Sequence, residues 1–366
     1  MSILILIVTL AVLILAHEFG HFITAKKSGV RVDEFGIGFP PKLYGKKIGE
    51  TEYTFNLIPF GGFVRIFGEN PGDAAENGPD KARSFIHKPK ITQAVIIVAG
   101  VFFNVLLAWV LISVGFMTGM PVPVSSAPQG VSVLNARVIV TNVLEGTPAE
   151  MAGIETGDAL TSLEAPGERY ENITVLGIQD FIARHGGVEV SIAYERGGEK
   201  GVSRATPAED IFGSVPAIGI SMDEIGTVEL LPHRAFFEGA RMTAGLTLAV
   251  GGAFAGLITD AVTGNAELAS LTGPVGMVGL IGDAAGFGFA YFLGFIAIIS
   301  LNLAVLNLLP IPALDGGRLF FLAIEAIKGS RLSPRFVNIA HATGFGVLIL
   351  FMLAVTYQDI MRIVAG

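Results

Sequence analysis

Three side chains near the start of the chain have the types and the spacing of a zinc hydrolase site. Residues 17–21 read His-Glu-Phe-Gly-His, so two histidines lie four positions apart and a glutamate follows the first. Residues four apart share one face of a helix, and both imidazoles can therefore bind a single zinc ion. Glu18 is then placed to act as a general base towards a water molecule.

The segment before this motif indicates where the site lies. Residues 2–16 carry no charge, and ionisable side chains at the end of such a membrane helix are costly unless they have a function. At about 1.5 Å per residue, His17 lies roughly 24 Å from Met1, inside a hydrocarbon core of about 30 Å. We therefore expect a site within the bilayer. The alternative, two histidines satisfied by a neighbouring helix, leaves Glu18 without a role.

A catalytic zinc ion needs a third protein ligand and one open position. The chain has no cysteine and only six histidines, and Asp315 is the strongest remaining candidate. It ends the stretch 307–315, whose prolines stop a regular helix, and broken backbone at membrane depth is tolerated only where it is buried or lines a polar cavity. Without the histidine motif, the dipeptide Asp315-Gly316 would indicate only a turn.

The composition agrees with a membrane protein, since 51% of the 366 residues are hydrophobic and only 15% are charged. Apolar runs predict four membrane-spanning helices, at 1–25, 91–117, 287–309 and 337–357. Residues 240–263 are also apolar but contain Arg241 and Asp260, so they are either a fifth span or a helix along the interface. Asp315 reaches the depth of the histidines only if its helix runs in the same direction as the first. The metal hypothesis therefore predicts that 240–263 does not cross.

The charges predict an orientation. Fifteen of the 24 Lys and Arg residues lie in the two segments 26–90 and 310–336, which the positive-inside rule places in the cytoplasm. The region 119–241 has 8 basic and 17 acidic residues and is therefore expected outside. Its short β-branched runs, separated by turn signals, predict a folded domain over 120–232. The formal net charge of −8 argues against a nucleic-acid partner.

Together these motifs give the chain a resemblance to the site-2 protease family, in particular to its bacterial regulator of sigma-E protease branch. The motifs that carry it are residues 17–21, 36–42 (GIGFPPK), 58–64 (IPFGGFV), 273–276 (GPVG) and 307–317 (NLLPIPALDGG). The resemblance implies Zn²⁺ held by His17, His21 and Asp315, with Glu18 activating the water. The substrate-binding residues that it implies are Asn307, Pro310, Gly61, Gly62 and Phe63. The last three lie in the segment 51–66, which resembles the family's membrane-associated β-loop, although by itself it indicates only an apolar hairpin.

The domain over 120–232 resembles a PDZ domain, through residues 137–143 (RVIVTNV), 146–160 (GTPAEMAGIETGDAL) and 217–220 (AIGI). A PDZ domain can bind an extended peptide at a sheet edge. This chain has room for one such domain, whereas the best-known proteobacterial relatives carry two.

The expected architecture is a polytopic α-helical membrane protein of four transmembrane helices, with an inserted extracytoplasmic PDZ-like α+β domain and a membrane-associated β-loop. Its parts are a first membrane half (1–119), the PDZ-like domain (120–232), an interfacial amphipathic segment (233–280) and a second membrane half (281–366). The expected activity is zinc-dependent intramembrane proteolysis of single-span proteins, such as an anti-sigma factor or a remnant signal peptide, in the bacterial inner membrane near its cytoplasmic side. The alternatives are a membrane zinc-binding or transport protein without proteolytic activity, and a scaffold in which the PDZ-like domain acts.

Overall fold

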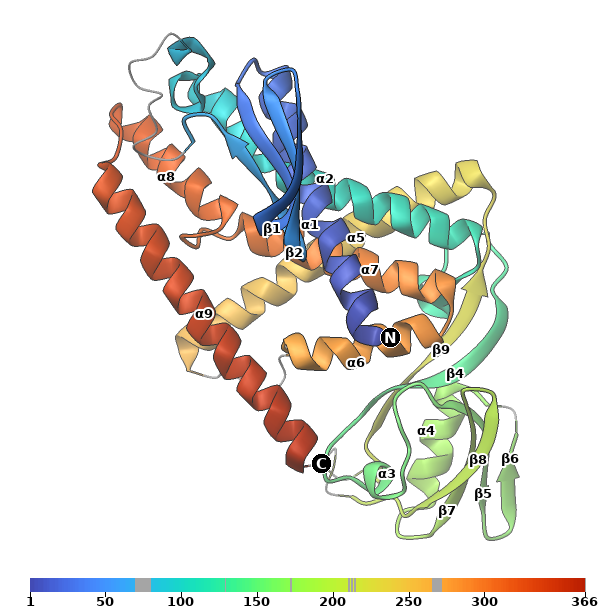
Figure 1. Ribbon diagram of the computed structural model, residues 1–366. Coiled ribbons are helices and arrows are strands. Elements are labelled where there is room, and N and C mark those ends of the chain that lie inside the picture. Colours follow the sequence, from blue (N-terminus) through green and yellow to red (C-terminus); the bar gives the residue numbers. More distant parts are fainter. Residues whose placement is uncertain are drawn as a thin grey trace. The chain divides into compact units, whose positions relative to one another are not determined.

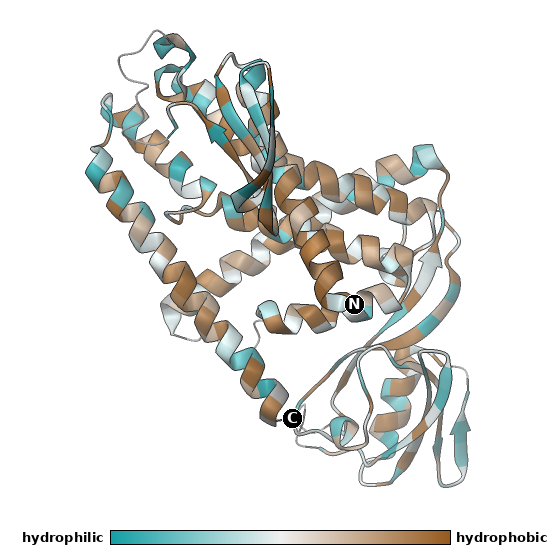
Figure 2. Ribbon diagram, viewed as in Figure 1, coloured by the Kyte–Doolittle hydropathy of each residue, from teal (hydrophilic) through white to brown (hydrophobic). Residues whose placement is uncertain are grey.

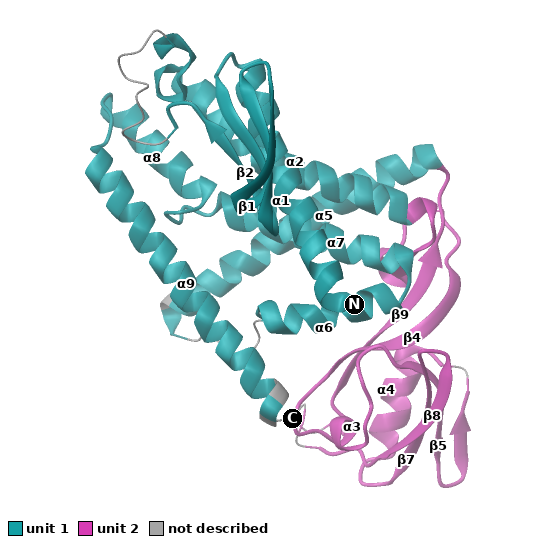
Figure 3. Ribbon diagram, viewed as in Figure 1, with its two compact units in different colours: residues 1–115, 232–366 teal, residues 116–231 magenta. Residues whose placement is uncertain are grey.

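The computed structural model describes residues 1–69, 80–128, 130–171, 173–209, 211, 213, 215–264 and 272–365. The chain forms two compact units (Figure 3). The first comprises residues 1–115 and 232–366, and the second comprises residues 116–231. The second unit is therefore inserted between the two halves of the first.

The first unit is mainly helical (Figure 1). Its helices are α1 (Ser2–Lys27), α2 (Lys90–Met117), α5 (Pro232–Thr263), α6 (Pro274–Gly286), α7 (Phe289–Leu308), α8 (Asp315–Lys328) and α9 (Pro334–Ala365), with short 3-10 turns η2 (Lys81–Arg83) and η3 (Phe85–His87). Most residues of α1, α2 and α7 are apolar (Figure 2), as expected for helices that face lipid and other helices rather than water.

Five described helices are long and apolar enough to cross a membrane, judged by length and composition: α1, α2, α5, α7 and α9. Four of them coincide with the four predicted spans. The fifth, α5, covers the segment 240–263 that the metal hypothesis expects not to cross. Residues 265–271 of the predicted interfacial segment lie outside the described residues.

A β-hairpin packs beside the end of α1 that carries the two histidines. It consists of β1 (Val32–Ile48) and β2 (Thr51–Ile66), and β1 pairs twice with β2, since Gly36 lies opposite both Thr54 and Phe63. The second half of β2 is thus an outer strand of a small twisted sheet. A cluster of buried apolar side chains, including Phe22, Val32 and Ile97, fixes this sheet to α1 and α2. The predicted segment 51–66 is therefore a strand, whose neighbours in the sheet all come from β1.

The second unit is an antiparallel sheet with two helices. Its elements are β3 (Met120–Pro123), η4 (Val124–Ser126), β4 (Leu134–Val143), α3 (Pro148–Met151), β5 (Ala159–Ala165), β6 (Glu168–Tyr170), α4 (Val175–Arg184), β7 (Val190–Arg196), β8 (Glu199–Ala205) and β9 (Ile220–Val228). The strand order is β3-β9-β4-β5-β7-β8, with β6 paired to β5. Gly197 and Gly198 both have positive φ, as the tight turn between β7 and β8 requires. Phe181, Leu163 and Ile192 are fully buried between sheet and helix, so the predicted α+β domain is confirmed.

Candidate metal centre and active site

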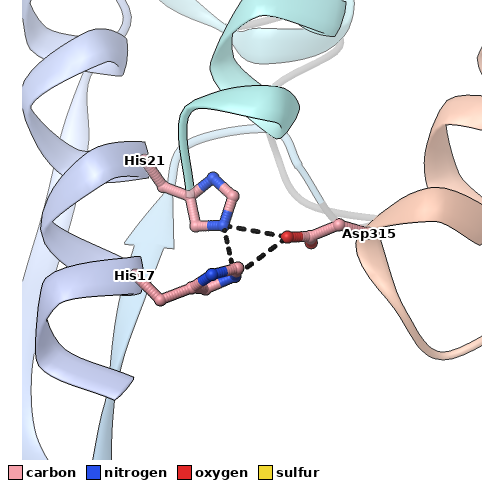
Figure 4. A group of neighbouring side chains, drawn as sticks. All are labelled: His17, His21 and Asp315. Carbon is pink, nitrogen blue, oxygen red and sulfur yellow. Dashed lines mark hydrogen bonds and ion pairs between the residues drawn. The ribbon is translucent and has the colours of Figure 1, made fainter. Parts of the chain in front are cut away.

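The two histidines of the motif lie one turn apart on α1, and both are 8% exposed. Asp315, the first residue of α8, faces them from the other half of the chain (Figure 4). Its Oδ2 lies 3.0 Å from Nε2 of His17 and 3.2 Å from Nε2 of His21. The two Nε2 atoms are 3.1 Å apart. The structure therefore brings together the three residues that the sequence proposes as ligands.

This cluster fits a zinc ion in distance and in donor type. Ligand atoms about 2.0–2.2 Å from a tetrahedral zinc ion lie about 3.3–3.6 Å from one another, only slightly farther apart than these three. Two imidazoles and one carboxylate are a usual set for a catalytic zinc ion with an open position. Room for the ion depends on Gly100 of α2, since a Cβ at this position would lie 2.4 Å from Nε2 of His21.

Neighbouring groups orient both imidazoles. Nδ1 of His21 lies 2.8 Å from the carbonyl oxygen of Ile96. A carbonyl only accepts hydrogen bonds, so Nδ1 carries the proton and leaves the lone pair of Nε2 free for a metal. On the other ring, Nδ1 of His17 lies 3.4 Å from Nδ2 of Asn104. Oδ1 of Asn104 is buried without a hydrogen-bond partner in the described part of the chain. Turning this amide over would let Oδ1 accept a hydrogen bond from the N–H at Nδ1 of His17.

Glu18 is held by the outer strand of the hairpin. The backbone N–H of Val64 donates to Oε2 of Glu18 over 3.0 Å. Gly61 and Gly62 let β2 approach α1 this closely, because a Cβ on either would lie within 3 Å of Ile14 or Leu15. The ring of Phe63 instead stacks on Phe39 of β1, with centroids 6.3 Å apart. Of the predicted residues of this loop, the two glycines thus lie against α1 and Phe63 lies within the sheet.

The loop between α7 and α8 folds back over the start of α8. A Cβ on Gly316 would lie 2.1 Å from the carbonyl oxygen of Leu309, and one on Gly317 would lie 2.3 Å from that of Ile311. The glycine pair after Asp315 is therefore needed for close packing. Asn307 is half-buried in the last turn of α7, and Pro310 is exposed in the loop. Both lie within eight residues of Asp315 in the chain.

The sequence of this chain matches the model of peptidase family M50 over residues 5–351. The chain belongs to peptidase family M50. A protein of Clostridium perfringens is 34% identical over 99% of both chains. The regulator of sigma E protease of Haemophilus influenzae is 28% identical over 98% of both chains. The zinc metalloprotease RasP of Geobacillus kaustophilus is 29% identical over 99% of this chain and 98% of its own.

Membership in family M50 confirms the resemblance to the site-2 proteases, and with it a membrane metalloendopeptidase that uses Zn²⁺. The comparisons give no support to the transport alternative. A solved PDZ domain from a Listeria monocytogenes protein aligns with 25% of this M50 peptidase at 24% identity and a TM-score of 0.21, a likeness too small to carry an argument.

Three features of the M50 site were not predicted. Gly100 and Asn104 of α2 contact the histidines, and the carbonyl of Ile96 orients one of them. A signal for Asn104 was present, because a polar amide inside the uncharged run 91–117 is costly without a partner. No comparable signal marked Ile96, whose contribution comes from its backbone.

A cavity of about 490 Å³ opens beside Asp315. Its polar lining includes Glu69, Arg318, Glu325 and His341. Arg318 donates a hydrogen bond to Glu69, and this neighbouring carboxylate raises the pKa of Arg318. Polar groups therefore line the space next to Asp315, one of the three residues of the metal-binding cluster.

Proposed function

We propose that this M50 peptidase hydrolyses single-span membrane proteins within the bilayer, at a zinc ion held by His17, His21 and Asp315. One observation carries this assignment. The three ligand atoms converge within 3.0–3.2 Å, next to Glu18 and directly after the uncharged run 2–16 of α1. Such a cluster inside a membrane segment fits hydrolysis of a bond that lies within the membrane.

Glu18 is the general base in this proposal. A bound zinc ion lowers the pKa of its water to about 7 and polarises the scissile carbonyl. Glu18 then accepts a proton from the attacking water and delivers it to the leaving amine. The N–H of Val64 fixes the direction of the carboxylate at a distance of 3.0 Å.

The outer edge of β2 is the proposed substrate-binding strand. The N–H of Val64 points from this edge to Glu18, so an extended peptide along the same edge would pass the general base. Gly61 and Gly62 allow the strand to pack directly against α1, and Phe63 supports the strand from within the sheet. Asn307 and Pro310 precede Asp315 in the chain, and we propose that they bind the peptide backbone near the scissile bond. A helical substrate must unwind there before its carbonyl becomes accessible.

We further propose four crossings, by α1, α2, α7 and α9, with α5 lying along the interface. α6 lies at the start of α1, where a Cβ on Gly282 would meet Oγ of Ser2 at 2.6 Å (Figure 1). The start of α5 lies beside the end of α2, where the indole N–H of Trp109 donates to the carbonyl of Phe236 over 2.8 Å. Because α1 and α2 cross in opposite directions, the start of α1 and the end of α2 lie on the same side of the membrane. The start of α5 and the whole of α6 therefore lie on that side too. An even number of crossings between them, here none, agrees with these contacts.

The positive-inside rule then places the segments 26–90 and 310–336 in the cytoplasm of a bacterial cell, and the second unit outside the inner membrane. We propose that this unit is a PDZ-like domain that binds an extended peptide at β9. Among the described strands, β4 pairs along Ile220–Thr227, whereas β3 covers only Ile225–Val228 on the other side. The open edge at the start of β9 is the place where a peptide strand would add.

The variant Glu18→Gln tests the assignment. It should retain zinc, because Glu18 is not a ligand, and should slow cleavage of a single-span model substrate by about 10²–10⁴-fold, the usual contribution of a general base. Glu171→Gln, an exposed glutamate of the second unit, is the matched control. Asp315→Ala should lose zinc itself. Cleavage at the wild-type rate by Glu18→Gln, or full zinc retention by Asp315→Ala, would overturn the proposal.

A further inference from the structure

Ala313, two residues before the proposed ligand Asp315, has an unfavourable backbone conformation. Its φ is +85°, and among the described residues only Asn135 shares a positive φ without being glycine. A side chain with a Cβ disfavours this region, and alanine lacks the polar group that helps asparagine to adopt it. Some neighbouring group must therefore hold Ala313 in place.

His341 of α9 is that neighbour. The N–H of Ala313 donates to Nδ1 of His341 over 2.8 Å. The imidazole is itself fixed by Phe321 of α8, with ring centroids 5.4 Å apart and planes at 87°. Because a backbone N–H can only donate, Nδ1 of His341 is the acceptor and its proton lies on Nε2.

The backbone of α9 supports the same loop one turn further on. A Cβ on Gly344 would lie 2.2 Å from the carbonyl oxygen of Pro312. His341 and Gly344 are three residues apart and therefore lie on one face of α9. That face contacts two consecutive loop residues, Pro312 and Ala313, so α9 packs closely against the loop.

We propose that His341 is a positioning residue for the metal centre. By accepting the hydrogen bond from Ala313 it holds the loop in the left-handed conformation, which presents the Asp315 carboxylate at 3.0–3.2 Å from the two histidines. His341 touches neither substrate nor metal. The inference rests on the proposed function, since it requires Asp315 to be a zinc ligand.

The alternative is a purely structural role, in which His341 only packs α9 against the rest of the first unit. The two interpretations differ in what Ala313 needs. Glycine adopts a positive φ at little cost. If His341 acts by holding Ala313 in this conformation, Ala313→Gly should make the histidine less necessary. If His341 serves only general packing, the residue at 313 should make no difference.

The experiment uses the full chain in detergent micelles and measures zinc affinity by competition with a chromogenic chelator, alongside cleavage of a model substrate. His341→Ala should weaken zinc binding by about 10–100-fold, as is typical when a group that orients a ligand is lost. His341→Asn should recover much of that loss, because Oδ1 of asparagine can take the place of Nδ1. In the Ala313→Gly background, His341→Ala should cost several-fold less. Ile339→Ala, an exposed residue on the same helix, should leave zinc affinity unchanged.

Wild-type zinc affinity in His341→Ala, or a loss of equal size in both backgrounds at position 313, would overturn the inference. If His341→Ala does not yield folded protein, His341→Asn and His341→Gln carry the same test. The acceptor of glutamine lies one bond too far to replace Nδ1, so equal zinc affinities of these two variants would also overturn it. Asp315→Ala distinguishes a failure of the proposed function from a failure of this inference. If Asp315→Ala retains zinc, the proposed function is wrong. If Asp315→Ala loses zinc but His341→Ala binds it as tightly as wild type, only the inference about His341 is wrong.

Discussion

Gly100 gives the metal centre its space, and a single methyl group at this position should remove it. A Cβ would lie 2.4 Å from Nε2 of His21 and 2.7 Å from Nε2 of His17, closer than real Cβ contacts. His21 cannot easily turn away, because its Nδ1 is bonded to Ile96. We expect Gly100→Ala to weaken zinc binding by about 100-fold or more while α2 remains helical, since alanine favours a helix.

The measurement is zinc content after dialysis against a weak chelator, with circular dichroism to report helix content. Gly251→Ala in α5 is the matched control, because a Cβ there meets no atom within 4 Å among the described residues. Full zinc content in Gly100→Ala would show that the ion does not lie between these imidazoles.

Asn104 offers a second test of how the histidines are oriented. If the amide is turned, its Oδ1 accepts a hydrogen bond from the N–H at Nδ1 of His17, and Nε2 of His17 is then free for the metal. We expect Asn104→Ala to lower zinc affinity by about 10–100-fold. Asn104→Asp, which keeps an acceptor and loses the donor, should bind zinc more tightly than Asn104→Ala.

The control is Asn302→Ala on α7, an amide whose Nδ2 donates to the carbonyl of Ile298 in its own helix. If Asn104→Asp binds zinc no better than Asn104→Ala, the amide nitrogen rather than the oxygen serves His17. The interpretation of the His17 tautomer would then be wrong, although the ligand set would stand.

At the scale of elements, the sequence predicts helices better than their contacts. The spans predicted at 91–117 and 287–309 differ from α2 and α7 by at most two residues at each end, because an apolar run marks a membrane helix directly. The sequence does not predict how α2 is rotated about its own axis. A helix that is apolar all round has no periodic face, so nothing in the pattern showed that Gly100 would meet the histidines.

The hairpin shows the same limit. The segment 51–66 is visible as an apolar strand, but its partner β1 contains the stretch 42–47, in which three lysines and a glycine do not indicate a strand. The double pairing of β1 follows from how β2 bends around it, which depends on non-local contacts. For Asp315, in contrast, the shortage of other ligands in the sequence was enough to name the right neighbour of the histidines.

The start of α6 is fixed from α9 by Asp359. The N-cap residue of α6, Gly273, has no side chain, and the carboxylate of Asp359 instead accepts from the N–H groups of Gly273 at 3.0 Å and Gly276 at 2.8 Å. Loss of a helix cap typically costs about 0.5–2 kcal/mol. We expect Asp359→Ala to speed amide hydrogen exchange at the start of α6 by about 2–30-fold, as read by mass spectrometry.

Met361→Ala, an exposed residue on the last turns of α9, is the control for that exchange experiment. Asp359→Asn should fall between wild type and Asp359→Ala, because asparagine keeps one acceptor. Unchanged exchange at Gly276 in Asp359→Ala would mean that α6 does not depend on this cap.

For the whole molecule, the distribution of charge and the contacts within the first unit favour one topology. The acidic second unit is inserted after α2, and the basic residues cluster in the segments before α2 and after α7. Four crossings place all of these segments on the sides that the positive-inside rule prefers. A crossing α5 would instead reverse α7 and α9 and would carry the segment 310–336 outside.

Labelling of single cysteines decides between these topologies, and it does so cleanly because the chain has no cysteine of its own. Thr263, the last residue of α5, is exposed, and the two topologies place it on opposite sides of the membrane. With α5 along the interface, Thr263→Cys in intact spheroplasts should react with a membrane-impermeant maleimide as fast as Ser125→Cys in the second unit. Ser330→Cys, beyond α8, should react only after the membrane is opened. If Thr263→Cys behaves like Ser330→Cys, α5 crosses. Asp315 could then meet His17 and His21 only if the chain between α5 and α7 crossed the bilayer again. The helix α6 has 13 residues and, at about 1.5 Å per residue, is too short to span a hydrocarbon core of about 30 Å alone.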